Sequence, residues 1–335
     1  MKYYESLMTK ETINWLLEDS NPSVKYYTLT DLLDKKESDS QVQKTKKNIM
    51  KNGVVPKILS KQNKNGYWDE LEKFYTAKYK GTVWQLIILA ELAADTSDAR
   101  IKKACEFILE YSQDKEEGGF SVYLSKKRSA GTPNYVIPCL TGNMVYSLIK
   151  LGYLQDNRTN SAINWIVKYQ RFDDGDSKPP AVWPYTRFEN CFGKHSCHMG
   201  VVKSLKALSE IPPKNRTKEI KSVIASGLEY LMMHHIYKKS HDLKTVSKPG
   251  WLRFGFPYMY QTDVLEILEI ISKLKYNDER MNDAVDHIIS KGNKQGVWLL
   301  EKTFNGKYQT NIEQKSKPSK WITLKALTVL KRLNK

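Results

Sequence analysis

The sequence has no long apolar run, no stretch of regular polar and apolar alternation, and no obvious export signal. No part of its 335 residues approaches about eighteen uninterrupted apolar residues, so no membrane-spanning helix is expected. Sustained alternation with a period of two is absent, which argues against a large sheet. The N-terminus lacks the basic-then-apolar layout of a signal peptide. These absences predict a helical, cytoplasmic protein.

Cysteine is scarce. The chain has four, Cys105, Cys139, Cys191 and Cys197. They could form two disulfides, but a core of this size does not need them, and a cytoplasmic setting favours reduced thiols. Metal binding by these thiols therefore becomes a question.

Arginine is also scarce, although the net charge is +17. The 54 basic residues comprise nine Arg and 45 Lys, spread along the whole chain. Direct readout of bases relies on arginine forks, and none cluster here. We therefore expect no specific nucleic-acid binding and interpret the lysines as a solvated basic surface.

What the sequence does have is a repeat of about sixty residues, a period typical of helical arrays. A helical segment and a polar turn ending in Gly and an aromatic recur at Lys57–Trp68, Ile101–Phe120 and Ala284–Trp298. A divergent copy runs from Ala162 to Trp183. After each turn comes an irregular stretch and then a more apolar helix. These apolar helices are predicted to begin near Pro22, Gly81, Cys139, Cys197, Tyr258 and Lys320.

Each copy has the pattern of two antiparallel helices, one amphipathic and outside, the other apolar on most sides and buried. Six such hairpins can close into a ring. The sequence therefore predicts an all-α fold, an (α/α)6 toroid formed as a single domain by residues 1–335. An open superhelical solenoid is the competing architecture, because equal repeats need not close.

The repeat resembles that of a known superfamily. The segment Gln62–Trp68 (QNKNGYW), echoed by Gln113–Phe120, is similar to the repeat of squalene and terpene cyclases and of protein prenyltransferase β subunits. The chain also resembles uncharacterised bacterial and archaeal proteins described as prenyltransferase-like. The resemblance implies the toroid fold. It does not imply one activity, because lanthionine cyclases, thioester domains and sugar-degrading enzymes share that toroid.

In such a ring the N-termini of the inner helices gather at one rim, where partial positive charge and free N–H groups suit anions. The loops before two of these helices carry Arg187, Glu189, Trp251 and Arg253. We expect these four to line one pocket, with the guanidinium groups clamping a diphosphate or carboxylate. Hydrogen bonds that only fix the loops are the alternative.

Other candidates near this rim are an acid and several aromatics. Asp263 could act with Glu189 as a carboxylate pair, and with Arg187 these form the candidate catalytic set. Ligand-binding aromatics, which an apolar cavity for isoprenoid chemistry requires, are expected from the same region. They are Trp183, Trp251, Tyr260 and Trp321. Aromatics at helical spacing are more often simply part of a core, which is the alternative interpretation.

The densest cluster of potential metal ligands is Cys191–His198 (CFGKHSCH). Repeat spacing places Cys139 at the same height on the neighbouring inner helix. The candidate zinc ligands are therefore Cys139, Cys191, Cys197 and His198, with His195 as an alternative. Three protein ligands and an open position make a catalytic zinc site, and helix N-termini together with Lys194 would favour thiolates. Packing cysteines and a structural histidine are the alternative.

The resemblance gives this site a chemical context. Protein prenyltransferases hold zinc with Asp, Cys and His and activate a thiol, whereas lanthionine cyclases use Cys, Cys and His. No Asp-x-Cys precedes an inner helix here. The leading hypothesis is an enzyme acting on a small apolar, isoprenoid or thiol-bearing molecule or a peptide in the central cavity, with zinc assistance. A non-catalytic binding toroid and a carbohydrate-active enzyme are the alternatives, and the oligomeric state stays open.

Overall fold

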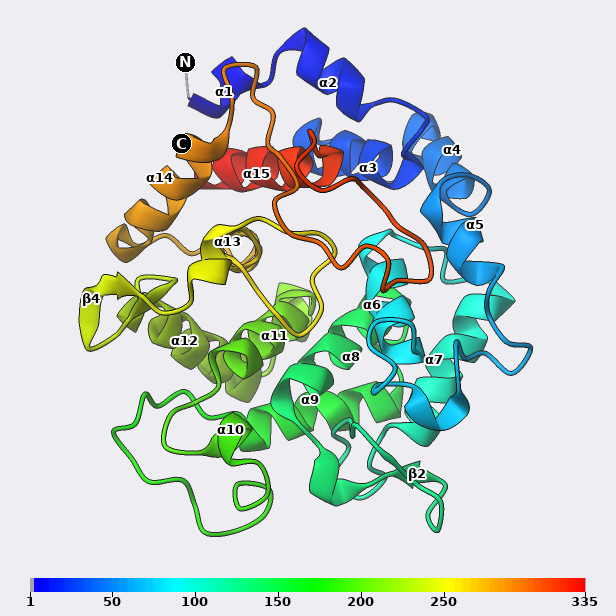
Figure 1. Ribbon diagram of the computed structural model, residues 1–335, viewed down its shortest axis with the longest axis vertical. Coiled ribbons are helices and arrows are strands. Elements are labelled where there is room, and N and C mark those ends of the chain that lie inside the picture. Colours follow the sequence, from blue (N-terminus) through cyan, green and yellow to red (C-terminus); the bar gives the residue numbers. More distant parts are fainter. Residues whose placement is uncertain (1–2, 335) are drawn as a thin grey trace.

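The computed structural model describes residues 3–334 as a helical protein with long connecting loops. Two small antiparallel ribbons accompany the helices (Figure 1). One pairs β1 (Leu124–Ser125) with β2 (Ala130–Gly131), and the other pairs β3 (Lys238–Lys239) with β4 (Asp242–Val246). The expectation of a mostly α-helical chain without a large sheet is confirmed for these residues.

The six apolar helices are deeply buried. They are α3 (Pro22–Tyr27), which a π-helical turn at Thr28–Leu32 continues, α6 (Thr82–Glu91), α8 (Pro138–Lys150), α11 (His198–Ser209), α13 (Val264–Lys273) and α15 (Lys320–Leu333). Every residue of α6 is buried, as expected for a helix enclosed on all sides. Five of the six begin within one residue of the predicted position.

The exception is α13, which starts at Val264 rather than near Tyr258. Residues 258–263 are not helical and form an irregular loop. Asp263 then caps the helix, because its side chain accepts a hydrogen bond from the backbone N–H of Glu266 at 3.0 Å. The predicted boundary was therefore wrong by about one and a half turns.

The outer helices are amphipathic and most begin at a capping side chain. They are α2 (Lys10–Leu16), α4 (Ser40–Ile49), α5 (Val54–Leu59), α7 (Ala99–Tyr111), α9 (Asn157–Tyr169), α12 (Lys218–Met233) and α14 (Asn282–Lys291). Two shorter helices are α1 (Tyr3–Leu7) and α10 (Glu189–Phe192). Asp98, Asp156 and Thr217 accept hydrogen bonds from first-turn N–H groups of α7, α9 and α12.

The repeat of Gln, Gly and an aromatic joins neighbouring hairpins. The side-chain amide of Gln62 donates to the carbonyls of Gly66 and, at 2.9 Å, of Arg100 at the start of the next outer helix. Gly66 has a φ of +94°, and a Cβ there would lie 2.6 Å from the carbonyl oxygen of Lys103. The Trp68 indole donates to the carbonyl of Ile58 at 2.9 Å. The motif is thus a device that docks one hairpin on the next.

Consecutive inner helices pack side by side. Contacts join α6 to α8, α8 to α11, α11 to α13 and α13 to α15, and α15 also contacts α3. The hydroxyl of Ser23 in α3 donates to the carbonyl of Leu92, just after α6, at 2.8 Å. In Figure 1 the first and last helices accordingly lie next to each other, and contacts between α1 and α15 agree.

The closest helix approach is between α8 and α11. A Cβ at Gly142 would lie 2.5 Å from the backbone of Lys203. The buried apolar side chains from Leu7 to Leu333 form one cluster. None of the helices in residues 3–334 is long and apolar enough to cross a bilayer.

Candidate functional site

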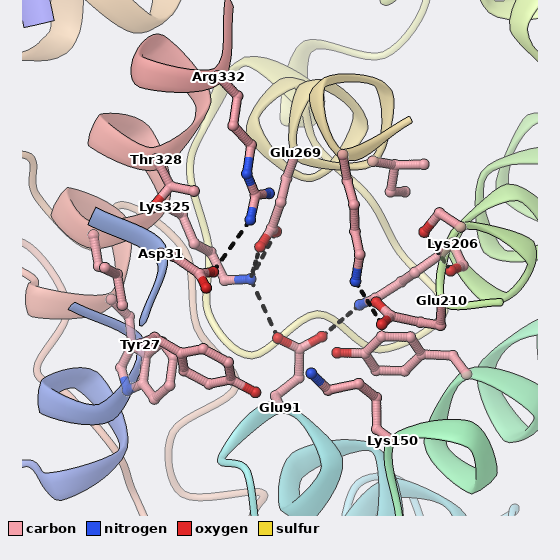
Figure 2. Close-up of a pocket in the computed structure, with 16 residues that line it drawn as sticks. Tyr27, Asp31, Glu91, Lys150, Lys206, Glu210, Glu269, Lys325, Thr328 and Arg332 are labelled. Atoms are coloured by element: carbon pink, nitrogen blue, oxygen red, sulfur yellow. Dashed lines mark hydrogen bonds and ion pairs between the residues drawn. The ribbon is translucent and has the colours of Figure 1, made fainter. Parts of the chain in front are cut away.

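All six inner helices contribute to one cavity of about 70 Å³ (Figure 2). Most of its lining residues lie in the C-terminal halves of these helices, whereas the sequence pointed to the N-terminal rim. The ionisable residues that line it are Asp31, Glu91, Lys150, Lys206, Glu210, Glu269, Lys273, Lys325 and Arg332, with Tyr27 and Tyr146. The cavity is therefore polar and highly charged.

Its floor is a network of buried ion pairs. Lys206 Nζ lies 2.5 Å from a carboxylate oxygen of Glu91 and 2.9 Å from one of Glu266. Lys325 Nζ lies 3.2 Å from Glu91 and 2.7 Å from Glu269. The side chains of Glu91, Lys206 and Lys325 are at most 7% exposed. One carboxylate thus joins two lysines from different helices at the centre of the molecule.

A fully enclosed pair lies next to this floor. Lys203, one turn before Lys206 on α11, is 2.6 Å from Glu266 of α13, and neither side chain has any exposed surface. Burying such charges is costly, so each must keep its partner.

The ion pairs of the cavity floor hold Glu91, Lys206 and Lys325 in their charged forms, whereas burial lowers the pKa of the neighbouring Lys203 to about 8. Burial would raise the pKa of Glu91, but the ammonium groups of Lys206 and Lys325 outweigh it and hold that pKa well below its usual range. Burial would lower the pKa values of Lys206 and Lys325, but the facing carboxylates raise both. These groups are therefore charged at neutral pH. They supply neither a carboxylic acid to donate a proton nor a neutral amine to accept one.

The more exposed edge of the cavity carries two further pairs. Arg332 lies 3.2 Å from Asp31, and Lys273 lies 2.5 Å from Glu210, with side-chain exposures between 12% and 35%. Burial would raise the pKa of Glu210, but Lys273 and Lys150 lower it overall. Exposure increases from floor to edge, which defines the side of the cavity nearest to solvent.

The predicted zinc ligands lie elsewhere and do not form a metal site. The thiols of Cys139, Cys191 and Cys197 are close enough to interact electrostatically. The His198 ring instead packs against the Trp251 ring, with centroids 4.3 Å apart. Within residues 3–334, no three His, Cys, Asp or Glu side chains are arranged to hold a metal ion. Zinc assistance stays a prediction that these positions do not support.

The thiols also differ from the expectation in their acidity. Burial raises the pKa of Cys191 to about 12 and raises that of Cys139 as well. The helix N-terminus and Lys194 were expected to favour thiolates, but desolvation of the sulfur dominates. Both thiols are therefore protonated at neutral pH.

The predicted anion clamp is not assembled around a shared partner. Arg187, Glu189 and Arg253 are exposed, whereas Trp251 is 4% exposed. In the described part of the chain, no ion pair joins Glu189 to either arginine. The segments before α11 and α13 thus place Arg187, Glu189 and Arg253 at the surface.

Asp263 is enclosed, unlike its proposed partner Glu189. It accepts hydrogen bonds from the Tyr258 hydroxyl at 2.8 Å and from the Gly255 N–H at 2.9 Å, besides capping α13. Burial raises its pKa to about 7 despite these bonds. These contacts give it a clear structural role in holding the loop before α13.

The predicted aromatics are dispersed. Trp183 packs edge-on against Tyr169, and Tyr260 lies beneath the ammonium of Lys78. Trp321 is 2% exposed, stacks on Phe256 with centroids 4.2 Å apart, and lines the charged cavity. Of the predicted ligand-binding aromatics, Trp321 is the one placed at this cavity.

The charged network is what sequence analysis missed. The sequence does contain a sign of it, namely charged residues within helices that are otherwise apolar on all sides. Lys203 and Lys206 interrupt α11, Glu91 ends α6, and Glu266 lies in the first turn of α13. Lysine and glutamate are almost never fully buried unless they are paired. Their presence in buried helices therefore predicts ion pairs between those helices.

Comparison with known proteins assigns no family. No family model matches the chain. Over 109 residues the chain is 29% identical to one of the subunits of the NADH-quinone oxidoreductase of Carboxydothermus hydrogenoformans, a match that covers 32% of this chain and 29% of that protein. A crystal structure of a protein from Actinoplanes aligns with 99% of both chains, at 12% identity and a TM-score of 0.46. Neither likeness is sufficient to transfer a function.

Proposed function

We propose that the chain is a helical toroid of the (α/α)6 type whose central cavity binds a small polar molecule, without catalysing its conversion. The observation that carries this proposal is the convergence of six inner helices on one charged cavity. The contact between α15 and α3 and the hydrogen bond from Ser23 to Leu92 support closure of the ring.

The character of the cavity favours a polar ligand over the isoprenoid that the sequence resemblance implies. Isoprenoid chemistry needs an apolar, aromatic-lined space. Here five cations and four carboxylates line about 70 Å³, which is room for a few water molecules. Such a cavity suits a compact molecule that can form hydrogen bonds.

Binding is favoured over catalysis because the three charged groups at the centre of the cavity floor are held in their charged states. A general acid or base needs a pKa near the working pH. The pKa of Glu91 is lowered and those of Lys206 and Lys325 are raised, which moves all three away from neutrality. Fixed charges orient a bound molecule well, but they do not exchange protons with it.

Isothermal titration calorimetry with the full chain tests this proposal. The panel contains small oxyanions, neutral polyols, small amines and a short isoprenoid alcohol. The variant Thr328→Met fills the cavity, and Thr76→Met is the control because Thr76 is exposed outside it. We expect a polar class to bind the wild type and Thr76→Met, and Thr328→Met to bind it at least tenfold more weakly. Binding of the isoprenoid alone, or of nothing in the panel, would contradict the proposal.

A further inference from the structure

We propose that the ligand of this cavity is a small oxyanion, such as a phosphate, a sulfate or a carboxylate, held by Lys150, Trp321 and Thr328. The inference rests on the proposed binding function and names its ligand class. It follows from which polar groups around the cavity have partners and which do not.

The unused hydrogen-bonding capacity includes two groups that can donate. Trp321 Nε1 and Thr328 Oγ1 are both buried and have no hydrogen-bond partner within residues 3–334, and both residues line the cavity. The side chains are 2% and 3% exposed. An indole N–H can only donate, and a threonine hydroxyl can donate. Leaving buried donors unpaired is costly, so the cavity favours a guest with acceptor atoms.

The charged group of the lining that has no ion-pair partner in contact is a cation. The four lining carboxylates, Asp31, Glu91, Glu210 and Glu269, each have a lysine or arginine within 3.2 Å. Lys150 is different, because among the described residues no carboxylate oxygen lies within 4.0 Å of its ammonium, although Glu210 and Asp31 interact with it from farther away. Its ammonium lies 5.3 Å from the centre of the Tyr27 ring and shares a hydrogen bond with that residue.

Tyr27 connects Lys150 to Trp321. The Tyr27 ring packs edge-on against the Trp321 ring with centroids 6.1 Å apart, so the cation and the indole both contact Tyr27. Figure 2 shows the Lys150 side chain reaching toward the centre from α8, on the side where Tyr27 lies. A negatively charged ligand beside Tyr27 would form a direct ion pair with Lys150.

Size and access agree with this ligand class. A volume of about 70 Å³ admits a compact ion rather than a chain. The cavity edge at Asp31 and Arg332 is 33% and 28% exposed, which gives a polar guest a route from solvent. Repulsion from the lining carboxylates is offset because the lining carries five cations against four carboxylates.

The test is calorimetric titration of the full chain with inorganic phosphate, sulfate, acetate and malonate, alongside glycerol and putrescine, at constant ionic strength. Lys150→Gln removes the unpaired charge, and Trp321→Phe and Thr328→Val remove one donor each with little change of shape. The control is Lys78→Gln, since Lys78 also lies over an aromatic ring without an ion pair, but outside this cavity.

We expect an oxyanion to bind the wild type, with affinity about tenfold lower or worse in Lys150→Gln and about fivefold lower in each donor variant. Lys78→Gln should bind like the wild type. The phosphate and carboxylate titrations distinguish the two sources, and binding of either supports the inference. Should Lys150→Gln not fold, the near-isosteric Thr328→Val carries the same comparison.

Three results would overturn the inference, and the first two differ in what they say of the binding function. If glycerol or putrescine binds in the cavity and no oxyanion does, the ligand class is wrong but the binding function stands. If nothing in the panel binds, both are wrong, and water satisfies the unpaired donors. Oxyanion binding that is equally strong in all three cavity variants would place the anion elsewhere and also overturn the inference.

Discussion

Replacing Lys206 by methionine should destabilise the protein strongly, because Lys206 is the cation that joins Glu91 to Glu266. Its side chain is 6% exposed and those of the two glutamates are 4% and 0% exposed. Methionine fills a similar volume but leaves both carboxylates without this partner. Of its two ion pairs, Glu91 then keeps the longer one, to Lys325 at 3.2 Å.

The size of the effect follows from the burial. Removing one partner of a buried ion pair typically costs about 3–5 kcal/mol, because a charge is left uncompensated. For a chain of 335 residues, about 4 kcal/mol corresponds to a decrease of about 6 °C in Tm. The matched control is Lys126→Met. Lys126 lies 2.8 Å from Glu72, but both side chains are more than half exposed, so the loss should stay below about 1 kcal/mol.

Thermal and urea unfolding followed by circular dichroism measure these differences. The double variant Lys206→Met/Glu91→Gln should recover part of the lost stability, because it removes one of the stranded charges. If Lys206→Met is as mild as Lys126→Met, the buried network does not hold the inner helices together as described. The description of the cavity floor would then be wrong.

Three further predictions concern His198, Gly142 and Cys191. Burial holds the pKa of His198 well below 6.5, so below pH 6.5 the unfolded chain takes up a proton that the folded chain does not. As the pH falls, the free energy of unfolding should therefore decrease by up to about 1.4 kcal/mol per pH unit relative to His198→Gln. Equal pH dependence of the two proteins would refute this. In urea unfolding, Gly142→Ala should lower the free energy of unfolding by at least about 2 kcal/mol, because its Cβ would lie 2.5 Å from the backbone of Lys203. Gly250→Ala, which has open space around it, should leave that free energy almost unchanged. Cys191, whose pKa is raised to about 12, should react with iodoacetamide at pH 8 far more slowly than glutathione does, and an equal rate would contradict its protonated state.

The helical part of the fold was predictable because its signals are local. Apolar helices, polar turns and capping residues recur along the sequence, so five of six inner helices could be placed to within one residue. The failure at α13 has a local cause too. The Asp263 cap sets its start at Val264, and apolar residues such as Tyr258 and Met259 extend the helix-like pattern into a loop.

The site was less predictable because it depends on the directions of side chains that come from six different helices. Sequence analysis placed function at the N-termini of the inner helices, where Arg187 and Arg253 turn out to be exposed. The charged cavity lies toward the other end, and its pairs join residues far apart in sequence, such as Glu91 and Lys325. Single-helix patterns show that such charges are buried, but not which partners they meet.

Binding of a small anion in the central cavity is tested most directly by identifying what the protein carries when it is purified from its own cells. Native mass spectrometry of the intact chain, followed by denaturation and analysis of the released small molecules, gives both stoichiometry and chemical class. The account predicts a compact, polar, anionic compound that is lost or reduced in Thr328→Met and retained in Thr76→Met. A stoichiometric isoprenoid or other lipid, retained in Thr328→Met, would contradict it.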